Sequence, residues 1–179
     1  MTDSSLPDSS RLLHHAYMQA VAYCDRGPST PFAPDEWYTY QGDGGALAAM
    51  FYYRRTESMT VRDHHGVDIT LTPVVNGQAW QHGLALSWDE LDGWTYTALY
   101  DEHSTVGDWW TRLPVPRLAS PAAIRALLPV LLDGREDELP RSVDQWQEPR
   151  AYTLGQHLAL VDAARERSYP EPSEVNRGH

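Results

Sequence analysis

Residues 83–101 read GLALSWDELDGWTYTALYD and carry the clearest structural signal in the chain. On both sides of the Asp-Glu-Leu-Asp-Gly turn at 89–93, large apolar side chains alternate with small or polar ones. This period of two is typical of a β-strand with one buried face. We therefore expect a β-hairpin with one apolar face. Its expected cross-strand pairs are Trp88 with Trp94, Leu86 with Tyr96, and Leu84 with Ala98.

A second hairpin is expected just upstream, at about residues 58–72. Strands at 58–63 and 67–72 flank His64-His65-Gly66, and a three-residue loop that ends in Gly suits a turn followed by a β-bulge. This register pairs Val61 with Ile69 and Met59 with Leu71. Residues 46–54 mix helix-forming and strand-forming side chains, and we favour a strand because β-structure follows.

Three helices are expected around these strands. The first runs from Ser10, a candidate N-cap, to Asp25. The second, at 122–132, follows the Ser120-Pro121 pair and ends at Gly134, and the third runs from Thr153 to about Arg167. We expect residues 27–45 to form a long loop with one short strand. Residues 107–113 are a candidate for a further strand.

These elements define an α+β fold. The antiparallel sheet is built from the hairpins at about 58–72 and 83–101, packed against the N-terminal helix and the two later helices. We expect one domain over residues 10–167. A disordered N-terminus, 1–9, precedes it and a loose tail, 168–179, follows it.

Composition narrows the classes of partner. The chain has 179 residues and a formal charge of −11, which disfavours nucleic acid and anionic membranes and favours a basic partner. It lacks a signal peptide and a stretch long enough to span a bilayer, so we expect a cytoplasmic protein. The one cysteine, Cys24, excludes an internal disulfide and is expected to be an inert core thiol.

Catalytic motifs are not evident. The eight histidines lack the i, i+4 spacing of a helical zinc pair, and no G-x-S-x-G elbow is present. Asp89 and Asp92 are expected to make the hairpin turn. The best acid–base candidates are Asp101 and His103 at a strand end, with His82 near Tyr100 across the hairpin. We expect no metal and no cofactor.

The aromatic residues are the unusual feature, with seven Trp and ten Tyr against two Phe. Five tryptophans lie close together in the sequence: Trp80, Trp88, Trp94, Trp109 and Trp110. If 109–110 is extended, one of its two indoles faces away from the core, because neighbouring side chains alternate. An outward Trp suits a protein contact or an apolar ligand cleft, whereas helices on both faces would bury all five.

One segment also resembles a known family. The run Leu84–Tyr96 with its WDE..GW turn, Leu113-Pro-Val-Pro and the helix start Ser120-Pro-Ala-Ala-Ile resemble small actinobacterial proteins of unknown function. The resemblance covers roughly residues 80–130 and implies a leading helix, a hairpin and a later helix opened by Pro. Residues 27–79 and 135–179 depart from that pattern. The resemblance implies no activity.

The leading hypothesis is a non-catalytic interaction or regulatory protein. It would use an aromatic surface near Trp109 and Trp110 to bind a protein partner, basic in character, or a second copy in a homodimer. One alternative is a small-molecule binder or enzyme with a Trp/Tyr-lined pocket that uses His82, Tyr100, Asp101 or His103. Another is an acidic immunity-type or DNA-mimic inhibitor, which predicts salt-sensitive binding to a basic protein.

Overall fold

The computed structural model describes residues 12–23, 32–62, 66–101, 103 and 105–168. The strands are β1 (Glu36–Gln41), β2 (Leu47–Tyr53), β3 (Met59–Arg62), β4 (Asp68–Leu71), β5 (Leu84–Asp89), β6 (Gly93–Ala98) and β7 (Thr111–Arg112). The helices are α1 (His15–Tyr23), α2 (Pro121–Leu132) and α3 (Pro149–Ser168), with short 3₁₀ turns η2 (Asp43–Gly45) and η3 (Glu136–Glu138). The expectations for Ser10, Cys24, His64-His65 and both termini (1–9 and 169–179) lie outside the described residues.

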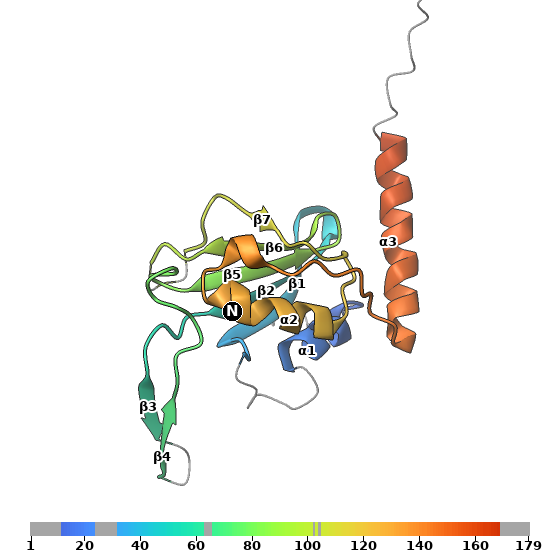
Figure 1. The fold of residues 1–179 in the computed structure, drawn as a ribbon. Helices are drawn as coiled ribbons and strands as arrows, with labels where there is room; N and C mark the ends of the chain where they lie inside the picture. Colours follow the sequence, from blue (N-terminus) through green and yellow to red (C-terminus); the bar gives the residue numbers. More distant parts are fainter. Residues whose placement is uncertain (1–11, 24–31, 63–65, 102, 104, 169–179) are drawn as a thin grey trace, which may run out of the picture.

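The α+β class is confirmed, and the main sheet has five antiparallel strands in the order β1-β2-β5-β6-β7 (Figure 1). The hairpin register is the predicted one, with Trp88 opposite Trp94. The strand predicted within 46–54 is β2, which pairs with β5 as well as with β1. Because β2 lies between two strands, all seven of its residues are buried.

The other predicted hairpin forms a sheet of its own. β3 and β4 pair with Val61 opposite Ile69 and Met59 opposite Leu71, as predicted. This two-stranded hairpin projects from the body of the molecule instead of joining the main sheet (Figure 1). Most of its described side chains are exposed, so neither of its faces has a core to pack on.

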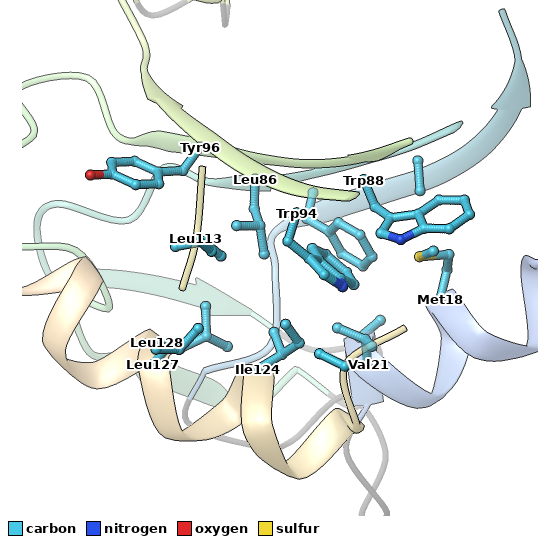
Figure 2. Close-up of a cluster of buried hydrophobic side chains, with 14 of the residues drawn as sticks. Met18, Val21, Leu86, Trp88, Trp94, Tyr96, Leu113, Ile124, Leu127 and Leu128 are labelled. Atoms are coloured by element: carbon cyan, nitrogen blue, oxygen red, sulfur yellow. The ribbon is translucent and has the colours of Figure 1, made fainter. Parts of the chain in front are cut away.

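Helices α1 and α2 cover one face of the main sheet. Figure 2 shows Leu86, Trp88, Trp94 and Tyr96 pointing from the sheet toward Met18 and Val21 of α1 and Ile124, Leu127 and Leu128 of α2. Several buried aromatic side chains have hydrogen-bond partners for their polar atoms, whereas the indole N–H of Trp146 has none among the described residues. The indole N–H of Trp88 donates to Arg117 O at 2.7 Å, and that of Trp80 donates to Leu131 O at 2.8 Å. Polar aromatics can therefore fill this core without a large desolvation cost.

The helix boundaries differ in two places from the sequence prediction. Helix α1 begins at His15, because residues 12–14 form a turn in which His15 N donates to Leu12 O. Helix α3 begins at Pro149, so the prediction that Thr153 caps it is wrong. Proline fits the first helical position because its φ is preset and its missing N–H would have no partner there. Helix α2 follows the prediction, with Ala123 N donating to Ser120 Oγ at 3.0 Å.

Helix α3 buries side chains only in its first half. Its buried residues are Ala151, Leu154 and Leu158, and residues 163–168 are all exposed. In Figure 1 the end of this helix extends away from the sheet. The described helices include none that is both long and apolar enough to cross a bilayer.

Candidate functional site

The second face of the main sheet, here called the open face, carries side chains from all five strands. The open face comprises Tyr38 and Tyr40 of β1, Ala48, Met50 and Tyr52 of β2, Ala85, Ser87 and Asp89 of β5, Thr95 and Thr97 of β6, and Arg112 of β7. Its buried apolar residues form a small cluster separate from the main core. Within the described residues, no helical side chain belongs to that cluster. The helices that the structure describes therefore cover one face of the sheet.

The loop 99–107 covers one end of the open face. Leu99 pairs with Val106 in a β-bridge, and both pack with Met50 and Tyr52. Gly107 lies so close to the sheet that a Cβ there would be 2.5 Å from Thr97 Oγ1. The loop closes this end, and the rest of the face remains accessible.

A hollow of about 550 Å³ occupies the accessible part of the open face. Its lining includes a row of residues in direct register across four strands: Met50 opposite Ser87, Ser87 opposite Thr95, and Thr95 opposite Arg112. Tyr40 on β1 and Trp110, just before β7, line it from the two edges of the sheet. Four spacings of about 4.8 Å separate β1 from β7, so the hollow crosses roughly 19 Å of sheet.

A ladder of tyrosine rings continues the hollow along β1 and β2. The ring centroids of Tyr38 and Tyr40 are 5.7 Å apart, and the hydroxyls of Tyr38 and Tyr52 are 3.2 Å apart. Burial, with help from the Tyr52 hydrogen bond, raises the pKa of Tyr38, which keeps its phenol neutral. The Arg54 guanidinium lies 4.7 Å from the Tyr52 ring centroid and pairs with Glu36 at 2.9 Å. These contacts fix the rings in place.

Two carboxylates and one guanidinium line the hollow. Asp89 Oδ1 accepts the N–H groups of Leu91 and Asp92 at 2.7 and 2.6 Å, so the expected turn chemistry is confirmed. Arg112 donates through Nε to Asp92 O at 2.9 Å, and its Nη2 is 3.8 Å from Asp92 Oδ1. The positive charge of Arg112 is therefore held beside Asp92. Among the described residues, no cation forms a direct ion pair with the Asp89 carboxylate, and its charge acts on the Arg117 guanidinium through space.

The structure places both Trp109 and Trp110 outside the core. Trp109 is 84% exposed and Trp110 is 38% exposed. Only Trp110 lines the hollow. Trp80, Trp88 and Trp94 are buried on the helix-covered face, so the aromatic cluster of the sequence divides into three core residues and two surface residues.

The hollow is not lined by the other residues that the sequence suggested for a site, namely Asp101, His103, Tyr100 and His82. The Asp101 carboxylate accepts the N–H groups of His103 and Thr105, each at 3.0 Å, and the Thr105 hydroxyl at 2.6 Å. The Thr105 hydroxyl and N–H lower the pKa of Asp101. Tyr100 is exposed nearby, and His82 is half-buried in the turn before β5. No ring contact joins the described side chains of His82 and Tyr100.

Sequence reasoning missed the tyrosines of the open face. The run EWYTYQ at 36–41 has period two, so Tyr38 and Tyr40 share a face opposite Trp37. That signal was present in the sequence. What the sequence did not indicate was which strands lie beside β1, and therefore that Tyr40 faces the same hollow as Trp110.

A partly buried polar network attaches α3 to the hairpin turn. Glu90, only 7% exposed, contacts His157 Nε2 at 2.7 Å through its carboxylate, and its carbonyl accepts from Arg117 at 2.9 Å. Arg117 also makes a two-point contact with Asp162 at 2.9 and 2.7 Å. These groups are paired with one another, so the arrangement serves to hold α3 in place.

Comparisons with known proteins identify no relative. No family model matches the chain, and neither the curated proteins nor the solved structures include a match. The resemblance of residues 80–130 to small actinobacterial proteins therefore stays a prediction. Among the described residues, no group of three or more His, Cys, Asp or Glu side chains is placed to hold a metal ion.

Proposed function

We propose that this chain is a non-catalytic interaction protein that binds a protein partner through the open face and the adjoining Trp109-Trp110 segment. The observation that carries the proposal is the one-sided sheet. The described helices cover one face, whereas the other face presents Tyr38 and a hollow lined by Tyr40 and Trp110. Tryptophan and tyrosine supply much of the binding energy at protein interfaces, because they bury a large area at a small cost in side-chain entropy.

The hydrogen bonds and the pKa of Asp101 also support binding rather than catalysis. Asp101, the best acid–base candidate in the sequence, accepts three hydrogen bonds within its own turn, and these lower its pKa. A general base near neutral pH needs a raised pKa, whereas the pKa of this carboxylate is lowered.

A small-molecule binder is the second candidate, and the volume of the hollow favours it. About 550 Å³ falls within the range of about 300–1,000 Å³ found for ligand pockets. In this case the polar groups would be those of the hollow (Ser87, Asp89, Thr95 and Arg112) instead of His82, Tyr100, Asp101 and His103. A thermal-shift screen against sugars, nucleotides and common cofactors separates the two, since a ligand at about 100 times its Kd adds about 2.7 kcal/mol of stability.

The protein-partner proposal is tested with two double variants that remove similar apolar surface. W109A/W110A removes both indoles beside the open face, and Y152A/L160A removes two exposed apolar side chains from α3. Each variant is immobilised and exposed to native cell extract. Circular dichroism checks that both variants remain folded.

We expect a protein that the wild type and Y152A/L160A retain and that W109A/W110A loses. Equal retention by all three proteins would place the contact elsewhere and contradict the proposal. So would a capture that Y152A/L160A alone abolishes.

A further inference from the structure

The hollow of the open face has the shape of a site for an extended peptide. It crosses the sheet from Tyr40 on β1, past the row Met50, Ser87, Thr95 and Arg112, to β7, over roughly 19 Å. An extended chain advances about 3.3 Å per residue, so about six residues span that length. The segment would lie across the strands, with Tyr40 at one end and Trp110 at the other.

The chemistry of the lining favours a positively charged side chain on that segment. Asp89 contributes a carboxylate, and the Arg112 charge is already held by the carbonyl and carboxylate of Asp92. The rings of Tyr40 and Trp110 add electron-rich faces that attract a guanidinium or an ammonium group. An anionic side chain would instead meet the net negative charge of a lining with two carboxylates and one guanidinium.

The net charge of the whole chain also favours a basic segment. A formal charge of −11 attracts a basic segment over long range and raises its rate of encounter with the surface. The long-range field and the local lining thus select the same sign of charge on the partner.

We propose that the hollow binds a basic side chain, arginine or lysine, carried by an extended segment of the partner protein, with Asp89 as the pairing carboxylate. This inference rests on the proposed function, because it names the chemistry of the partner that the open face takes. It predicts that Asp89 sets the preference for charge and that Trp110 contributes to binding whatever the charge.

Three hexapeptides of otherwise identical sequence test the proposal. One carries arginine at its two central positions, the second carries citrulline (the neutral counterpart of arginine), and the third carries glutamate. Calorimetric titration measures each against the full-length protein and against D89N, W110A and D137N. The Asn in D89N keeps an oxygen that can accept the turn hydrogen bonds. D137N removes the same charge from the exposed η3 turn and is the matched control.

We expect the arginine peptide to bind at least tenfold more tightly than the citrulline peptide, and the glutamate peptide to bind least. D89N should lose at least fivefold in affinity for the arginine peptide, whereas D137N should keep it. Equal affinity for arginine and citrulline, equal effects of D89N and D137N, or no binding of the arginine peptide at millimolar concentration would each overturn the inference.

The two proposals can fail separately. If the partner retained from extract is lost in W110A but kept in D89N, the open face binds a partner without using a basic side chain, and only the inference fails. If both variants retain the partner as the wild type does, the open face is not the interface and the proposed function fails as well.

Discussion

Tyr17→Phe removes a single oxygen atom from the centre of the helix-covered core. The Tyr17 ring is fully buried, and its hydroxyl donates to Ala119 O at 2.7 Å. The same oxygen accepts the indole N–H of Trp94 at 3.0 Å. One hydroxyl therefore joins helix α1, strand β6 and the segment that leads into α2.

The expected cost is the sum of two unsatisfied groups. Without the hydroxyl, the carbonyl of Ala119 and the N–H of Trp94 stay buried and lose their partner. Leaving a buried polar group without a partner costs about 1–3 kcal/mol. We therefore expect Y17F to lower the free energy of unfolding by about 2–6 kcal/mol, with little change in volume.

Urea unfolding followed by far-ultraviolet circular dichroism measures this loss, and an unchanged m-value shows that the native state stays compact. The double variant Y17F/W94F supplies the control. Once the tyrosine oxygen is gone, removing the indole N–H takes away an unpaired donor. The loss of unfolding free energy in the double variant should therefore be smaller than the sum of the two single losses, by about 1 kcal/mol or more. A Y17F loss below about 1 kcal/mol, or strict additivity, would refute the reasoning.

Three further predictions concern pH, backbone geometry and helix packing. Burial lowers the pKa of His14 below its usual value of about 6.5, so the unfolded chain binds the proton more readily than the folded chain. The free energy of unfolding should therefore fall as the pH drops from about 6.5 toward the pKa of the folded state. Urea titrations at several pH values measure this fall, and H14Q should make it smaller. Gly83 has φ of 103°, and a Cβ there would lie 2.2 Å from Tyr53 O, so G83A should cost more than about 2 kcal/mol in urea unfolding. G44A, with φ of 73° and open space around it, should cost only about 1 kcal/mol in the same assay. Amide hydrogens of residues 163–168 should exchange much faster than those around Leu154, because that end of α3 buries no side chain, and similar protection along the whole helix would contradict this packing.

Much of the fold was predictable from local patterns. Alternation of side chains and a recognisable turn were sufficient for the pairing of Trp88 with Trp94, because the register of a hairpin depends on residues close in sequence. The same reasoning gave the right register for the hairpin at 58–72. It did not reveal that this hairpin stands apart, since strand pairing between distant segments leaves no comparable pattern in the sequence.

The candidate site was less predictable for the same physical reason. The hollow depends on β1 and β7 occupying opposite edges of one sheet, which brings Tyr40 and Trp110 to a single surface. The sequence does indicate that one indole of Trp109-Trp110 points outward if the segment is extended. It does not indicate which side of the sheet lacks helices. Asp89 was assigned only a role in the turn, which its Oδ1 atom fulfils.

The projecting β3–β4 hairpin has a practical consequence for engineering. The N–H of Val74 donates to Arg55 O at 2.8 Å at the base of this hairpin, and none of the described side chains between 58 and 72 belongs to either buried cluster. Chain segments of this kind tolerate insertions, because no buried backbone is disturbed. A fluorescent domain or an affinity tag inserted between β3 and β4 would leave the five-stranded sheet and its open face unaltered.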